Sequence, residues 1–280
     1  MHRLLIQSLR WLDVRMVYLV TSLFVIPVCL LLNTNHSRTS AYHFYRHRLR
    51  YGRLRAAWSV YINHCLFSQV VVDRFAVFAG KHFHLDIEGY EHFRQLESEP
   101  KGFMIFSSHI GCYEVAGYSL ISKTKRFNAL VFGGEKATVM AGRQEVLGHH
   151  NIRMIPVKED MSHLFLVNEA LDNNEIMSMP ADRIIGSAKS VTSVFMDAEA
   201  RFPAGPLSVA TMKGLDVLAV NVMKTSAKHY KVYVARLSYD KQAPRRQQIQ
   251  QLADSYVKEL EHRVRQYPLQ WFNFYDFWSR

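Results

Sequence analysis

The fold is decided by the stretch Gly102-Phe-Met-Ile-Phe-Ser-Ser-His-Ile-Gly-Cys-Tyr-Glu114, an apolar run that passes into a polar segment. The run predicts a buried strand over 102–107. His109 and Glu114 are five positions apart, and a regular helix would separate their side chains by ~140°. The two side chains can meet only if His109 lies on a turn before a helix and Glu114 lies in the first turns of that helix. Gly111 permits that tight passage, so we expect strand, turn and helix in this order.

Similar apolar runs recur along the chain and alternate with stretches of helical periodicity. Further buried strands are expected at 129–132, 153–157, 176–179, 217–222 and 231–237. Helices are expected at 112–123, 136–149, 161–172, 206–213 and about 245–267, after two helices between 41 and about 80. This alternation is typical of an α/β fold, with a mostly parallel central sheet flanked by helices.

An uncharged N-terminal segment precedes these elements. Met16–Leu32 has no charged residue over 17 positions, and as a helix it measures ~26 Å, slightly less than a hydrocarbon core of ~30 Å. Pro27 kinks such a helix. The segment is therefore a short span, a helix inserted in one leaflet, or a buried core helix. No small-x-small cleavage site follows it, so we expect it to be retained. We expect residues 1–35 to form a membrane anchor or interfacial helix, and residues 36–280 a single further domain.

The charge of the chain indicates an anionic partner. The formal net charge is +11, which suits nucleic acid, an anionic membrane or an acidic carrier protein. The segment after the anchor, 36–55, carries six arginines and no acidic residue, at positions 38, 46, 48, 50, 53 and 55. Basic residues close to a membrane segment favour the cytoplasmic side and attract anionic headgroups. A solvated helical face is the plainer alternative. Since no nucleic-acid recognition motif is present, we predict no nucleic-acid partner.

The chemistry of the His109–Glu114 block follows from its geometry. A carboxylate that accepts from one imidazole nitrogen fixes the tautomer and leaves the other nitrogen as a base. A helix N-terminus nearby would offer N–H groups to a developing oxyanion. A purely structural hydrogen bond at a strand end is the alternative. The three cysteines have no disulfide or zinc spacing, and the histidines have no metal-ligand spacing, so no metal and no cofactor is predicted.

Three further blocks follow in order: Pro180-Ala-Asp-Arg-Ile-Ile-Gly186, Phe202-Pro-Ala-Gly-Pro206 and the aromatic ending Tyr267–Trp278. Together with a His-x4-Glu motif that has glycine two positions after the histidine, they resemble the lysophospholipid and lipid A late acyltransferase superfamily. The ending lacks the basic His-Arg-Arg cluster of mainstream lipid A enzymes. It resembles instead a branch of predicted acyltransferases that is often associated with aryl polyene and other specialised bacterial lipids.

The resemblance implies roles for particular residues. His109 would be the general base of a direct acyl transfer and Glu114 would orient it, with Cys112 a buried, inert thiol. The substrate-binding residues would be Gly111, Asp182, Arg183, Phe202, Gly205, Pro206 and, on a predicted helix, Arg143.

The resemblance also implies partners and a location. The donor would be acyl-ACP, whose carrier protein is acidic, or acyl-CoA, and the acceptor an amphipathic lipid carrying a hydroxyl or amine. The acyltransferase catalytic domain, 36–280, would lie on the cytoplasmic face of the cell inner membrane. The rival interpretation is a non-catalytic lipid- or acyl-carrier-binding protein on the same fold.

Overall fold

The structure is a computed structural model that describes residues 2–32, 36–112, 120–131, 151–158, 160–184 and 189–278. Its helices are α1 (His2–Trp11), α2 (Val14–Val20), η1 (Thr21–Val25), α3 (Ile26–Leu31), α4 (Ser37–His43), η2 (Phe44–Arg48), α5 (Arg53–Phe78), α6 (Tyr90–Ser98), α9 (His163–Asp172), α10 (Ala204–Met212), α11 (Arg245–Gln266) and η3 (Pro268–Gln270). Its strands are β1 (His84–Glu88), β2 (Phe103–Ser107), β3 (Phe127–Val131), β4 (Ile152–Pro156), β5 (Ile176–Pro180), β6 (Ser190–Phe195), β7 (Ala198–Pro203), β8 (Val217–Lys224) and β9 (His229–Leu237).

The predicted α/β fold is confirmed. A seven-stranded sheet has the order β1-β9-β8-β2-β5-β3-β4, in which every neighbouring pair is parallel except β8 with β9. The five strands from β8 to β4 thus run in one direction, and β9 and β1 in the other. Because β2 lies between β8 and β5, the residues that follow β2 lie over the middle of the sheet.

Two hydrophobic cores cover the two faces of the sheet. Along β2, Met104 and Phe106 point into a core shared with α9, α10 and α11, whereas Phe103 and Ile105 point into a core shared with α6. This alternation follows from the two-residue period of a strand. All four side chains are at most 2% exposed, as expected for a parallel strand covered on both faces.

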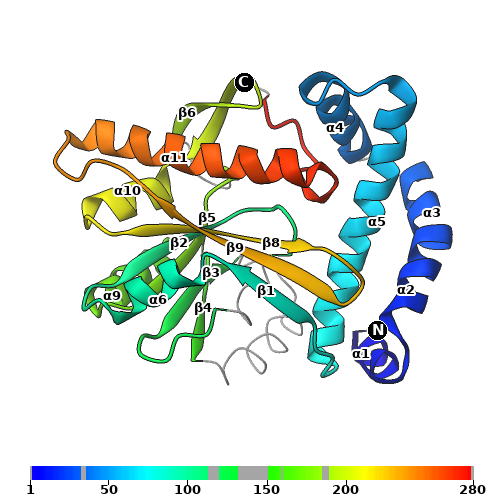
Figure 1. The fold of residues 1–280 in the computed structure, drawn as a ribbon, viewed down its shortest axis with the longest axis horizontal. Coiled ribbons are helices and arrows are strands. Elements are labelled where there is room, and N and C mark those ends of the chain that lie inside the picture. The colour runs from blue at the N-terminus through cyan, green and yellow to red at the C-terminus, as the bar shows by residue number, and fades with distance from the viewer. Residues whose placement is uncertain are drawn as a thin grey trace.

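The N-terminal helices pack on α5 rather than on the sheet. Figure 1 shows α1, α2 and α3 beside the long helix α5, which stands between them and the strands. Leu9, Val14 and Tyr18 pack there against α5 residues that include Phe75 and Ala76. Within the apolar stretch Val14–Leu31, which is long and apolar enough to cross a membrane, only Val14, Tyr18 and Ile26 are buried.

A buried ion pair joins α5 to β8, and α2 contributes a hydroxyl to it. Lys224, at the end of β8, pairs with Asp73 of α5, and both side chains are at most 3% exposed. The Tyr18 and Tyr230 hydroxyls donate to the same carboxylate. Burial lowers the pKa of Lys224, although Asp73 opposes this effect. One hydroxyl of α2 therefore belongs to a polar cluster inside the protein.

Some elements differ from those expected. The region 41–80 contains α4, η2 and the single 26-residue helix α5. Strand β1 and the antiparallel hairpin β6–β7 were not predicted, because the prediction rested on continuous apolar runs, whereas these half-exposed strands alternate polar and apolar residues. The predicted helix 136–149 lies outside the described residues, as does most of 112–123, and residues 120–123 are not helical.

Candidate active site

The register between β2 and β5 brings His109 and Asp182 together. These strands are parallel neighbours, and Ser107 pairs with Pro180 at their carboxyl ends. His109 and Asp182 each follow two positions later, so both lie past the carboxyl edge of the sheet at the same level. Ligands and catalytic groups of open α/β sheets gather at this edge.

Both oxygens of Asp182 accept hydrogen bonds from His109. Oδ1 lies 2.8 Å from Nδ1 of the imidazole, and Oδ2 lies 2.7 Å from the backbone nitrogen. The Asp182 side chain is 2% exposed and that of His109 is 22% exposed, so the carboxylate is buried while the ring reaches the surface.

Asp182 is held in its ionised form. Burial alone would raise the pKa of Asp182, but the charge of His109, its two hydrogen bonds and nearby Arg183 outweigh burial, and the pKa is lowered. An ionised carboxylate can only accept, so Nδ1 of His109 must donate. The basic lone pair of the neutral ring is therefore on Nε2.

The turn after β2 is held tightly against β8. The Cys112 amide donates to Val222 O at 2.7 Å, and Gly111 has a positive φ of 62°. A Cβ added to Gly111 would lie 1.9 Å from Val222 O, which no side chain can tolerate. Glycine is therefore required here both by the backbone conformation and by the close approach of β8.

The amides of this turn already have acceptors. His109 N donates to Asp182, Gly111 N to Gln270 O at 2.8 Å, and Cys112 N to Val222 O. None of these three groups is available to an oxyanion. The helix N-terminus expected for that purpose falls on residues 113–119, which lie outside the described residues.

Arg183, which the sequence singled out, directly follows Asp182 in the chain. Its Nη2 donates to Phe272 O, and its Cζ lies 5.5 Å from the centre of the Tyr275 ring. Its Nε is buried and has no hydrogen-bond partner among the described residues. The guanidinium of Arg183, which follows Asp182 in the chain, therefore has at least one buried donor with no described acceptor.

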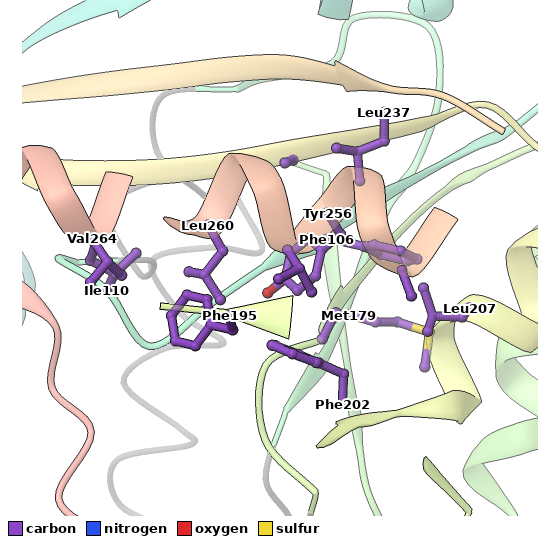
Figure 2. Packing of buried hydrophobic residues seen from close by; sticks show 14 of the residues in the cluster. Phe106, Ile110, Met179, Phe195, Phe202, Leu207, Leu237, Tyr256, Leu260 and Val264 are labelled. Carbon is purple, nitrogen blue, oxygen red and sulfur yellow. The ribbon is translucent and has the colours of Figure 1, made fainter. Parts of the chain in front are cut away.

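The other predicted substrate residues that the structure describes are Phe202, Gly205 and Pro206. Phe202, 1% exposed, lies in the core; Figure 2 shows it near Phe195, Met179 and Leu207, beneath helix α11. Gly205 and Pro206 lie in the first turn of α10, and Pro206 is buried. Their contact with a substrate stays a prediction. Glu114 and Arg143 lie outside the described residues.

Sequence reasoning assigned Asp182 to the substrate, whereas the structure places both its oxygens on His109. It also missed two supports of the strand end. Ser108 donates to Asn221 of β8 at 2.7 Å, and the Tyr256 hydroxyl of α11 donates to Ser107 O at 3.1 Å. An available signal was that His109 and Asp182 each follow a predicted strand.

In the described part of the chain, no cluster of His, Cys, Asp or Glu could hold a metal ion.

Comparison with known proteins identifies relatives of the chain. Residues 76–280, about three quarters of the sequence, match the family described as bacterial lipid A biosynthesis acyltransferase. No curated protein matches. Among solved structures, the chain is similar to the 1-acyl-sn-glycerophosphate (LPA) acyltransferase PlsC from Thermotoga maritima, at 13% identity and a TM-score of 0.42, over 95% of this chain and 98% of that chain. That TM-score is too low to support a conclusion, so the family match alone identifies the relatives.

Proposed function

Since the chain belongs to the bacterial lipid A biosynthesis acyltransferase family, we propose that it transfers a fatty acyl group from an acyl thioester to a hydroxyl or amine of a lipid, with His109 as general base. The observation that carries this mechanism is the pairing of the His109 Nδ1 with the buried, ionised Asp182. The pairing makes Nε2 the basic nitrogen.

The proposed step balances without any cofactor. The acceptor oxygen or nitrogen attacks the carbonyl carbon of the thioester while His109 Nε2 takes its proton. The tetrahedral oxyanion then collapses and expels the thiolate, which takes the proton back from the imidazolium. The products are an acylated lipid and a free thiol. Asp182 stabilises the imidazolium through its charge, as a buried carboxylate does in other histidine-based sites.

Arg183 is the proposed partner for negative charge. The oxyanion or a phosphate of either substrate could accept from its guanidinium, in a site where three turn amides are already engaged. Gly111 keeps the turn in shape. Phe202, Gly205, Pro206 and Arg143 remain proposed substrate contacts, and the orienting role of Glu114 toward His109 remains a prediction.

We place the reaction at a membrane surface. The arm 1–35 would associate with the bilayer and the domain 36–280 would carry the site, on the cytoplasmic face of the inner membrane. Support comes from apolar side chains that are exposed on both the arm and α5, among them Trp11 at 91%, Phe24 at 67% and Leu54 at 89%. The basic segment that follows the arm suits anionic headgroups. An acidic acyl carrier protein would be drawn to the same positive field, and acyl-CoA is the other donor.

The test is the loss of turnover in His109→Ala. Purified protein would be incubated with an acyl carrier protein thioester or acyl-CoA and a bacterial lipid extract. Thiol release and newly acylated lipid would be measured, the latter by mass spectrometry. We expect wild-type transfer and its loss in His109→Ala, with vesicle binding and circular dichroism unchanged. His92→Ala, which removes a surface histidine from α6, is the matched control.

Acyl transfer retained by His109→Ala would contradict the assignment of the base. A wild type that binds acyl carrier protein or lipid but releases no thiol would instead favour the rival, a non-catalytic binding protein.

A further inference from the structure

A short C-terminal segment, Pro268–Asn273, runs alongside the turn that carries His109; we name it the strap. Gly111 N donates to Gln270 O at 2.8 Å, and Phe272 N donates to His109 O at 3.1 Å. Between them, Ile110 and Trp271 form an antiparallel bridge. The His109 turn is therefore hydrogen-bonded like a strand, to β8 on one side and to the strap on the other.

Gln270 links the strap directly to β8. Its Oε1 accepts from Lys224 N at 2.9 Å, its Nε2 donates to Lys224 O at 2.8 Å, and its side chain is buried. Its own carbonyl accepts from Gly111. One residue thus satisfies both backbone groups of Lys224 at the end of β8 while holding the turn. A primary amide has the donor and the acceptor for this, and a carboxylate or an apolar chain does not.

Two other elements hold the strap in place. Asn63 of α5 donates through Nδ2 to Leu269 O at 2.9 Å and to Trp271 O at 3.1 Å. On the opposite side, Arg183 donates to Phe272 O. The strap therefore connects α5, β8, the His109 turn and the residue that follows Asp182, so its position affects both members of the His109–Asp182 pair.

We propose that the strap is part of the catalytic apparatus, and that Gln270 is a positioning residue that sets the placement of His109. This inference rests on the proposed function. Gln270 acts through the backbone of Gly111 and does not touch the reacting atoms. A displacement of a catalytic group by about 1 Å costs on the order of 10²-fold in rate, so loosening the strap affects turnover more than substrate affinity.

Two variants loosen the strap at different points. Gln270→Met keeps the length of the side chain and removes both hydrogen bonds to Lys224. Asn63→Leu removes the two hydrogen bonds from α5 and leaves Gln270 intact, so the test does not depend on one variant folding. Thr211→Val is the matched control, because it removes a buried hydrogen bond inside α10, from Thr211 Oγ1 to Leu207 O.

The readouts separate positioning from simple stabilisation. We expect Gln270→Met to lower kcat by about 10²-fold, with the KM for donor and acceptor changed by no more than about twofold. Asn63→Leu should lower kcat in the same direction. Native-state hydrogen exchange should accelerate at Gly111 N and Phe272 N in both variants, with the β8–β9 amides other than Lys224 N unchanged. Thr211→Val should leave kcat and these two amides as they are.

Each outcome bears on the proposal. Unchanged kcat in folded Gln270→Met and Asn63→Leu overturns it, even if exchange accelerates, because the strap would then be structural only. Equal losses of kcat in Thr211→Val overturn it as well. If the wild type itself transfers no acyl group, the proposed function fails and takes this inference with it. Active wild type with equally active variants leaves the proposed function standing.

Discussion

Replacing Asp182 by asparagine changes the charge and the donor pattern around His109 with almost no change in volume. In the wild type both carboxylate oxygens accept, Oδ1 from the imidazole Nδ1 and Oδ2 from the backbone N–H of His109. An amide has one oxygen and one NH2 group, so it can satisfy only one of these two donors.

Each orientation of the amide in Asp182→Asn is unfavourable. If the amide oxygen accepts from the backbone N–H, the NH2 group faces Nδ1. The ring must then carry its proton on Nε2 and cannot act as a base. If the oxygen faces Nδ1, a buried backbone N–H loses its acceptor, which costs about 1–3 kcal/mol, and a charge-assisted bond worth about 1.5–3 kcal/mol is weakened. The lost acceptor weakens the fold in the resting and transition states alike. The charge-assisted bond is strongest when the ring becomes cationic, so its weakening by about 1.5–3 kcal/mol lowers the rate by about 10–10²-fold.

The assay is thiol release from the acyl thioester in the presence of lipid extract, with acylated lipid quantified by mass spectrometry. Asp216→Asn is the matched control, because Asp216 pairs with Arg236 and Lys241 at the surface. Retention of more than about a tenth of the wild-type rate by Asp182→Asn would refute the tautomer argument. A larger loss in Glu114→Gln would assign the orienting role to Glu114, as the sequence predicted.

Three further predictions concern stability and membrane binding. Asp73→Leu leaves the buried Lys224 ammonium without a counter-charge and should lower the free energy of unfolding in urea by about 3–5 kcal/mol. Adding Lys224→Met should restore part of the lost stability. If the destabilisations of the two single variants simply add in the double variant, the buried pair is contradicted. The folded pKa of Asp182 lies below its ordinary value of 3.8, so its contribution to stability is present above that pH and is lost on further acidification. The free energies of unfolding in urea of the wild type and Asp182→Asn should therefore converge below about pH 4. A difference that grows below that pH would contradict a lowered pKa of Asp182. Trp11→Ser with Leu54→Ser should weaken sedimentation with anionic vesicles at least about tenfold without altering stability, because both side chains are exposed; unchanged sedimentation would exclude them from the membrane surface.

The strands of the central sheet were predictable where they are fully buried. β2, β5 and β8 are predominantly apolar, and the structure places them within a few residues of the expected positions. β1 and the β6–β7 hairpin were missed because each mixes charged or hydroxyl residues into a half-exposed strand. Their alternating pattern is a signal of half-buried strands, which a prediction based on continuous apolar runs does not detect.

The sequence predicted the part of the site around His109, but not its pairing with Asp182. His109, its turn and the glycine at position 111 follow from local sequence, since they concern adjacent residues. Its pairing with Asp182 depends on β2 lying beside β5, although β3 and β4 come between them in the chain. Strand order in a sheet is a property of the crossovers, and the sequence pattern of a single strand does not contain it. The strap was likewise hidden, because Gln270 acts on residues 46 and about 160 positions away.

The pairing of Ser107 with Pro180 has a consequence for how the site forms. A slip of one residue between β2 and β5 would turn every β5 side chain to the opposite face and carry the Asp182 carboxylate away from the ring. Such a slip would also place buried β5 side chains on the wrong faces, so the two hydrophobic cores that enforce the register also enforce the pairing of His109 with Asp182.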